Sequence, residues 1–176
     1  MFDKDESPET ALRRKFWKEL EASPFVMLGL QGVEDSRTRP MTAQIDIPYG
    51  ADDEDGGQIY FFGSRSEHLV QGLDGQHRAV ATFASKGHAL FAHLHGTLAI
   101  DNDRAVIDRL WGPVIASWYR QGKDDPDLVL LRFDTEHAEI WEADPRSMFK
   151  AVLVKLFGRD PGKNHQENHR AEVQLS

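Results

Sequence analysis

Three arginines and two serines, in two short segments, have side chains that suit recognition of an anion. Arg37 and Arg39 lie at the start of one predicted strand, and Arg65 follows another strand, between Ser64 and Ser66. Guanidinium groups bind phosphate through charge-assisted hydrogen bonds, and hydroxyl groups and the amides of a helix start add further donors. The two segments together predict a phosphate pocket, although each arginine alone is also typical of a solvated strand end.

Histidine is the other abundant chemical group, with eight residues, of which His88, His93 and His95 lie close together. In a strand, residues 93 and 95 point to the same face, so their imidazoles can share a metal ion. No carboxylate lies at short spacing to complete such a site. We therefore predict rim histidines of a barrel and no metal site, with a haem ligand as a less favoured alternative.

Acidic residues cluster in two places, Lys123–Asp127 and Ala51–Gly57. A carboxylate in the first cluster can act as an acid or a base. Asp124–Pro126, however, has the composition of a turn with Asx-type hydrogen bonds that starts the next strand, and we favour this interpretation. The second cluster is interpreted as a solvated hairpin tip, because its spacing does not match a calcium-binding EF-hand loop.

Several function classes are excluded by what the sequence lacks. It contains no dinucleotide-binding glycine fingerprint, no P-loop and no serine-hydrolase elbow. The absence of cysteine excludes disulfides and thiolate-bound zinc or iron–sulfur centres. A net charge of −8 without a basic block argues against nucleic-acid or anionic-membrane binding. With no apolar run near the roughly 20 residues of a membrane span and a polar N-terminus, we expect a cytoplasmic protein.

Hydrophobic periodicity predicts a single domain that is mainly β, a closed antiparallel barrel with peripheral helices. We expect residues 1–9 to be a disordered lead-in and residues 10–176 to form the domain. Strands are predicted over residues 24–32, 37–50, 58–64, 78–85, 88–101 and 127–142, with a short last strand at 169–175. The strand at 24–32 is expected to be buried and the strand at 37–50 half-buried, with the two strands around the acidic cluster forming a hairpin.

Helices are predicted over residues 7–20, 64–73, 102–122 and 148–157. The expected N-caps are Ser7 for the first helix, Ser64 or Ser66 for the second, and Asn102 or Asp103 for the third.

The helices also contain a predicted break and three tryptophans. Gly112-Pro113 interrupts the third helix, which predicts a kink or two short helices. Trp111 and Trp118, seven residues apart, are expected on one face of this helical segment, before a buried strand. Trp17 is expected at the rim of the apolar face of the first helix.

Five segments, in this order along the chain, resemble the general stress protein 26 family of pyridoxamine 5'-phosphate oxidase-like FMN-binding split barrels. They are RPMTAQID, IYFFGSRS, HGTLAIDNDRAVIDRLW, ASWYRQGKDDPDLVLLRF and AEIWE. The resemblance runs from about Ala11 to Asp144, and its most specific part is W-x6-W-[YF]-x2-G-K-D-D-P-D-L-x-L-L-R. It implies an antiparallel split β-barrel, FMN as the cofactor, and a homodimer with flavin sites at the interface between the subunits.

The resemblance also implies which residues contact the flavin. The RPMT segment runs beside the flavin ring and ribityl chain, FFGSRSEH leads to the phosphate, and two tryptophans approach the flavin. The implied cofactor-binding residues are Arg39, Met41, Thr42, Phe62, Gly63, Ser64, Arg65, His68, Trp118 and Trp141. Many relatives have a lysine where this chain has His68 or Leu69, and a neutral histidine adds a hydrogen bond without a fixed charge. Arg65 is therefore expected to compensate.

Two functions are compatible with this family. The first is a flavin-dependent oxidoreductase that takes electrons from a reduced nicotinamide, and the second is a non-catalytic flavin-binding or flavin-sequestering stress protein; haem binding in a related barrel ranks third. The arginine and histidine that hold the pyridoxal substrate in the oxidases have no counterpart after Trp141. Pyridoxamine-phosphate oxidation is therefore not expected, and the sequence assigns no catalytic residue.

Overall fold

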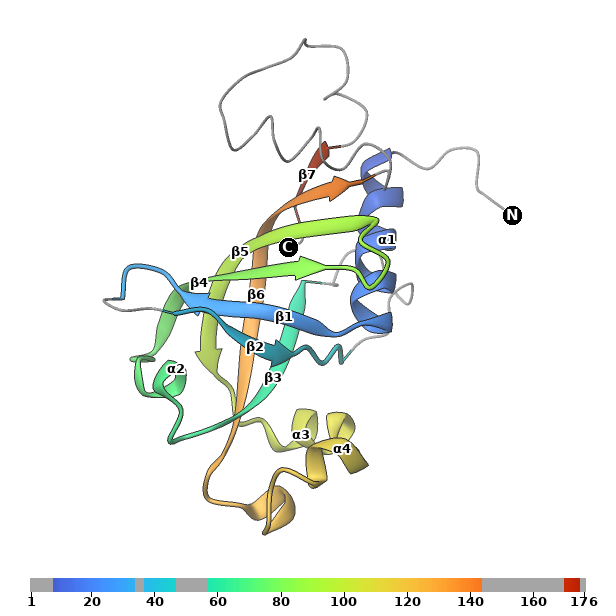
Figure 1. The fold of residues 1–176 in the computed structure, drawn as a ribbon. Helices are drawn as coiled ribbons and strands as arrows, with labels where there is room; N and C mark the ends of the chain where they lie inside the picture. Colours follow the sequence, from blue (N-terminus) through green and yellow to red (C-terminus); the bar gives the residue numbers. More distant parts are fainter. Residues whose placement is uncertain (1–7, 34–36, 47–56, 144–169, 175–176) are drawn as a thin grey trace.

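A computed structural model describes residues 8–33, 37–46, 57–143 and 170–174 of the chain (Figure 1). The elements are α1 (Pro8–Ala22), β1 (Phe25–Leu30), β2 (Arg39–Thr42), β3 (Gln58–Ser64), α2 (His68–Gln71), β4 (Gln76–Ala84), β5 (Leu90–Ile100), α3 (Arg104–Leu110), α4 (Pro113–Ala116), the 3-10 helix η1 (Gly122–Asp124), β6 (Leu128–Glu142) and β7 (Arg170–Gln174). The predicted helix at 148–157 and residues 1–7 of the predicted lead-in at 1–9, including the expected N-cap Ser7, lie outside the described residues. Pro8 and Glu9 already belong to α1. None of the helices described here is both long and apolar enough to cross a membrane.

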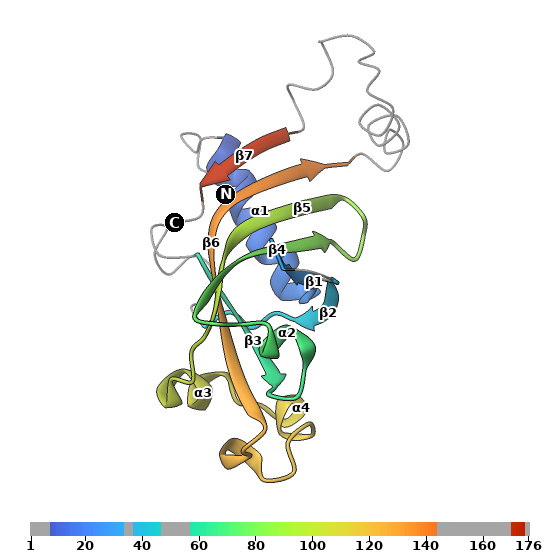
Figure 2. The ribbon, with the colours of Figure 1, turned by 90° about the vertical axis from the view of Figure 1, so that its left-hand side faces the viewer.

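One antiparallel sheet with the strand order β2-β1-β4-β5-β6-β3 curls into a nearly closed barrel (Figures 1 and 2). The long strand β6 pairs through its first half with β3 and through its second half with β7. Two reciprocal backbone hydrogen bonds between Gln44 and Tyr60, both 2.8 Å, join the two ends of the strand order. The predicted mainly β, antiparallel split barrel is confirmed.

The predicted hairpin between residues 37–50 and 58–64 is reduced to a single antiparallel bridge in the described part of the chain. β2 pairs with β1 and β3 pairs with β6, so among the described residues only the Gln44–Tyr60 bridge pairs these two segments. Alternating hydrophobicity identifies each strand but does not say which strand is its neighbour. Residues 51–56 of the acidic cluster lie outside the described residues.

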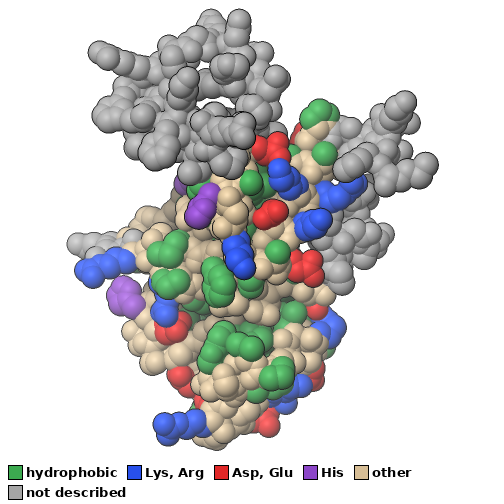
Figure 3. All heavy atoms as spheres, turned by 45° about the vertical axis from the view of Figure 1, so that its right-hand side comes forward, with side chains coloured by type: hydrophobic (Ala, Val, Ile, Leu, Met, Phe, Trp, Pro, Cys, Tyr) green, Lys and Arg blue, Asp and Glu red, His purple; other side chains and the backbone are tan. Residues whose placement is uncertain are grey.

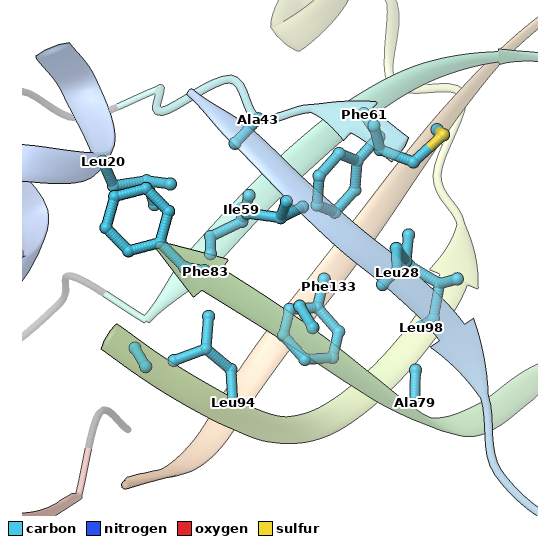
Figure 4. Close-up of a cluster of buried hydrophobic side chains, with 14 of the residues drawn as sticks. Leu20, Leu28, Ala43, Ile59, Phe61, Ala79, Phe83, Leu94, Leu98 and Phe133 are labelled. Carbon is cyan, nitrogen blue, oxygen red and sulfur yellow. The ribbon is translucent and has the colours of Figure 1, made fainter. Parts of the chain in front are cut away.

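The interior of the barrel is filled by apolar side chains from every strand of the curled sheet and from α1 (Figure 4). Leu20 and Phe16 of α1 are fully buried, and the Phe16 ring lies edge-on to Phe83 of β4 at 5.9 Å. Trp17 is also buried, with 2% of its surface exposed, so the prediction that it lies at a rim is wrong. The buried face of α1 is therefore wider than the apolar face expected from the sequence, because it includes Trp17.

The first four residues of β6 are all buried because both of their faces are covered. One face points into the barrel, and the other packs under α3 and α4 with a second group of apolar residues. This group consists of Tyr60, Phe62, Val106, Ile107, Ile115, Tyr119, Leu128 and Leu130. An unbroken apolar run is the pattern expected of a strand that is covered on both faces.

The helical segment divides at Gly112-Pro113 into α3 and α4, as predicted. Asp103 is the N-cap of α3 and its carboxylate accepts from Ala105 N at 2.8 Å, which confirms one of the two predicted caps. Trp111 and Trp118 do not share a helical face, because Trp111 is already extended (φ −68°, ψ 120°) and Trp118 follows the end of α4. Gly112 and Pro113, which cap and begin α4, lie between them.

The prediction that the strand at 24–32 is buried is also wrong in part. In β1, Val26 and Leu28 are buried, whereas Phe25 is 64% exposed and Met27 is 40% exposed. Successive side chains of a strand alternate between its faces. The outer face of β1 therefore carries apolar side chains that the described part of the chain leaves uncovered.

We expect Gly96→Ala to destabilise the protein by about 3 kcal/mol, at the upper end of the range for overpacking in a core. Gly96 lies in β5, where the register with β6 shifts, and a Cβ atom there would overlap the Asp134 carbonyl oxygen and lie 3.1 Å from the Phe133 ring. Gly87→Ala is the matched control, because a Cβ there meets nothing within 4 Å. Urea unfolding of the two variants tests this, and equal stabilities would contradict it.

Candidate functional site

A cavity of about 410 Å³ lies between the segment that enters β2 and the short helix α2. It is lined by Leu30, Val33, Arg37, Thr38, Arg39, Pro40, His68, Leu69 and Gly72. This volume lies within the range of about 300–1,000 Å³ that is usual for small-molecule sites. The cavity combines apolar walls with three basic side chains that come from two separate parts of the chain.

The positions of the basic residues follow from local structure. Arg39 begins β2, an end strand of the sheet order, where it is in register with Leu28 of β1. An end strand also tolerates Pro40, which has no backbone N–H to donate to a neighbour. His68 begins α2 and is exposed, and Arg37 is exposed just before β2. The structure thus brings Arg37, Arg39 and His68 to one cavity.

Arg39 forms an ion pair with Glu67, with Nη2 donating to Oε1 at 3.0 Å. The side chains are 36% and 24% exposed, but Arg39 Nε and Glu67 Oε2 are both buried and have no hydrogen-bond partner. Buried polar atoms are nearly always paired in folded proteins. The Arg39 guanidinium therefore retains donor capacity at the edge of the cavity.

Arg65 and Ser64 have other partners. Arg65 Nε donates to the Pro126 carbonyl at 2.9 Å, and the Ser64 hydroxyl donates to the Asp127 carboxylate. The amide of Arg65 donates to the Asp127 carbonyl at 2.9 Å. These contacts attach the end of β3 to the turn before β6, and neither Arg65 nor Ser64 is among the residues that line the cavity.

The predicted donors at the helix start are also engaged. Ser66 N donates to Ser64 Oγ at 3.1 Å, and Glu67 N donates to the Ser64 carbonyl at 3.1 Å. The N-cap of α2 is Glu67, so the prediction of Ser64 or Ser66 as the cap is wrong. Ser64 caps the preceding turn instead, because the chain turns once more before the four-residue helix begins.

Four further residues implied by the family resemblance do not line the cavity. Met41 is 7% exposed and belongs to the barrel core, and Thr42 is half-buried at the end of β2. Phe62 is buried against Trp111, with ring centroids 5.9 Å apart. The Gly63 carbonyl accepts a hydrogen bond of 2.8 Å from the Tyr119 hydroxyl.

Trp118 comes before the long strand β6, and Trp141 lies near its end. Trp118 is 50% exposed in the turn after α4, before β6 begins. Trp141 is half-buried near the end of β6, in register with Phe91 of β5. One copy of the chain therefore does not bring these two indoles together.

The histidines of β5 are arranged as predicted, on one face of the strand. His93 and His95 stack at 4.5 Å, and His137 of β6 lies 6.4 Å from His95. Across the described ranges, no three histidine or acidic side chains are grouped so that they can hold a metal ion. His88 lies apart from them, in the turn between β4 and β5, with φ 55°.

The acidic segment before β6 is a hydrogen-bonded turn, as predicted. Asp125 Oδ1 accepts from Asp127 N at 3.0 Å, and Oδ2 accepts from Gln121 N at 3.2 Å. These backbone donors lower the pKa of Asp125 below its ordinary value. Its carboxylate is therefore held ionised as part of the turn.

Two residues near the cavity were missed by the sequence analysis. Glu67 contacts a residue 28 positions away, and no local pattern indicates such a pairing. Tyr119 lies within the WY pair of the family motif, which was the only available signal. Burial, followed by the nearby charges of Glu67, Asp127 and Asp125, raises the pKa of Tyr119, so its hydroxyl remains a donor to the Gly63 carbonyl.

The family model of the pyridoxamine 5'-phosphate oxidase-like proteins matches residues 12–158. The chain therefore belongs to this family, and the resemblance seen in the sequence is confirmed. No curated protein matches the chain.

Three solved structures show what the chain is similar to. One is a general stress FMN/FAD-binding protein from the phytopathogen Xanthomonas citri, with 49% identity, a TM-score of 0.68, and coverage of 76% of this chain and 90% of that chain. A protein described as a general stress family member from Xanthomonas campestris pv. campestris shares 49% identity, with a TM-score of 0.70 and coverage of 79% and 92%. A protein described as general stress protein 26 from Jannaschia sp. CCS1 shares 29% identity, with a TM-score of 0.67 and coverage of 94% and 99%.

We expect Tyr119→Phe to lower the free energy of unfolding by about 1–2 kcal/mol, because the Gly63 carbonyl would remain buried without its donor. Tyr60→Phe is the matched control and should cost less, because the Tyr60 hydroxyl donates to the exposed side chain of Gln58.

The unfolded chain ionises tyrosine near pH 10, about its reference value. Since the folded-state pKa of Tyr119 is higher, wild-type stability should fall above about pH 10, and Tyr119→Phe should reduce this loss. Urea unfolding at pH 7 and pH 10.5 (chosen to lie about half a unit above the reference) tests both statements, and equal losses for the two variants would contradict the first.

Proposed function

We propose that this protein binds a flavin, FMN in particular, with the phosphate held at the cavity of Arg37, Arg39 and His68. The observation that carries this proposal is the cavity itself, in which basic residues of two distant segments meet beside the apolar side chains of Leu30 and Leu69. A phosphate-bearing aromatic ligand needs this combination of basic donors and apolar walls. The 49% identical protein from Xanthomonas citri is described as FMN/FAD-binding, which supports the same conclusion.

The residues of the site also fit the group chemically. The buried Arg39 Nε has no partner, and Arg37, Arg39 and His68 are the basic groups that line the cavity. Arg37 and Arg39 would hold the phosphate, and His68 would add a hydrogen bond. The bound flavin would supply hydride and electron transfer, with a reduced nicotinamide as the electron donor.

A non-catalytic role is the second candidate function. Among the residues that line the cavity, His68 is the only one of a type commonly used as a general acid or base. An acid–base step within one copy of the chain would therefore depend on this exposed histidine. The scarcity of acid–base groups is compatible with a protein that only binds or sequesters a flavin. Absence of turnover with a reduced nicotinamide would support this second function.

We further propose a homodimer that covers the outer face of β1. Phe25 and Met27 are exposed on this face, and Met27 is in register with Pro40 of the cavity wall on one side and with Thr82 on the other. Hydrophobic side chains also reach the surface among charged ones in Figure 3. A second copy on this face would bury apolar surface and border the cavity, which is the arrangement expected of flavin sites at a subunit interface.

We expect Arg39→Ala to weaken FMN binding by about 1.5–3 kcal/mol, the scale of a hydrogen bond to a charged group. Riboflavin, which lacks the phosphate, should lose little affinity. Arg65→Ala is the comparison variant, since Arg65 contacts the Pro126 carbonyl outside the cavity, and it should leave the ratio of the two affinities unchanged. Flavin fluorescence titrations at one salt concentration measure both affinities. Equal losses of FMN and riboflavin in Arg39→Ala would contradict the proposed phosphate site.

The wild-type protein should sediment with about twice the 20.0 kDa mass of the chain, and Met27→Glu should sediment as a monomer. The added carboxylate would be buried without a partner on the proposed interface. Gln31→Glu, an exposed position just after β1, is the control and should remain dimeric. A wild-type monomer at micromolar concentration, with and without FMN, would contradict the dimer.

A further inference from the structure

We propose that Glu67 is a positioning residue that fixes the Arg39 guanidinium at the cavity before the ligand arrives. The inference rests on the proposed phosphate site, and it concerns a residue that does not itself line the cavity. Glu67 would act on the ligand only through Arg39, which does line it. The following contacts carry this inference.

The Arg39–Glu67 pair joins the two sides of the cavity. Arg39 belongs to β2, and Glu67 is the residue directly before α2, which forms the opposite wall. Their single bond of 3.0 Å runs from Nη2 to Oε1. Elsewhere, β2 and its extension meet the β3 side only through the Gln44–Tyr60 bridge among the described backbone pairings.

The Glu67 carboxylate is itself held in place. A Cβ atom on Gly63 would lie 3.2 Å from Glu67 Oε2, so the carboxylate packs directly over the backbone of this glycine. The Glu67 backbone is fixed at both ends, because its N–H donates to Ser64 and its carbonyl accepts from Gln71 N at 3.0 Å. A carboxylate held in this way gives Arg39 a fixed anchor.

This anchor leaves most of the guanidinium available. Arginine has five N–H donors, and the contact with Glu67 uses one of them. Nε is buried and unpartnered, so the pair has one hydrogen bond and not the two of a bidentate arginine–carboxylate pair. An arginine that is already immobilised loses less conformational freedom when it binds a phosphate, which increases affinity.

The negative charge of Glu67 acts in the opposite direction, because it repels a phosphate. The pair is partly exposed, at 36% and 24%, so solvent and salt screen this repulsion. Positioning is not screened in this way. The contribution of positioning to FMN affinity should therefore persist at high ionic strength, where the opposing repulsion is weaker.

The test compares FMN and riboflavin affinities of the wild type, Glu67→Gln, Arg39→Ala and the double variant, at low and high salt. Glu67→Gln keeps the shape of the side chain and removes the charge. We expect it to weaken FMN binding about three- to tenfold, the scale of one immobilised side chain, at both salt concentrations. Riboflavin affinity should not change, and the effect should vanish in the Arg39→Ala background. Asp74→Asn, which removes an exposed charge beyond α2, should change neither affinity.

Each alternative outcome overturns the inference in a recognisable way. Tighter FMN binding by Glu67→Gln would show that Glu67 opposes the phosphate. A loss that persists without Arg39, or that affects riboflavin equally, would show a structural role for Glu67. If the wild type prefers FMN to riboflavin and Glu67→Gln retains the full preference, only this inference fails. If the wild type binds neither flavin, the proposed function fails with it.

Discussion

Closure of the barrel between β2 and β3 is the constraint on which the rest of the structure depends. The sheet order places these two strands at opposite ends, and the Gln44–Tyr60 hydrogen bonds bring them together. Because this contact is a single bridge, the start of β2 pairs with β1 but not with β3 among the described residues. The cavity lies there, between that segment and α2. A fully paired seam would satisfy more backbone groups but would leave less room for a ligand.

Beyond the barrel, α3 and α4 convert the start of β6 into a strand that is covered on both sides. This second apolar group includes Tyr119, whose hydroxyl reaches the carbonyl of Gly63 at the end of β3. Ion pairs of Lys123 with Asp108 and of Arg104 with Asp124 hold α3 to the following turn. These exposed pairs each contribute little to stability, but the buried group fixes where β3 ends. The position of α2, and so of one cavity wall, follows from this.

The positive charge at the cavity depends on which arginines are not fully engaged in ion pairs elsewhere. The chain carries a net charge of −8, and several of its arginines are already paired, such as Arg109 with Asp46 and Arg132 with Asp101. The guanidinium of Arg109 lowers the pKa of Asp46, as expected for a carboxylate held in its ionised form. Arg39 is also paired, but with one bond and with an unpartnered Nε. In an acidic protein, such partly engaged arginines are the positions at which an anion can be accommodated.

The sequence by itself determined the strands, the division of the helical segment at Gly112-Pro113, the turn at Asp125 and the family, because these depend on local periodicity, capping and motif order. It also indicated Arg39 and His68. Only the tertiary structure decided which arginine faces the cavity, since the Arg65 side chain donates to the Pro126 carbonyl, 61 residues away in the sequence. The sequence likewise contained no signal for the exposure of Met27 or for the pairing of Glu67 with Arg39. Pairing between distant segments leaves no periodic trace in a single sequence, because each partner satisfies its own local pattern.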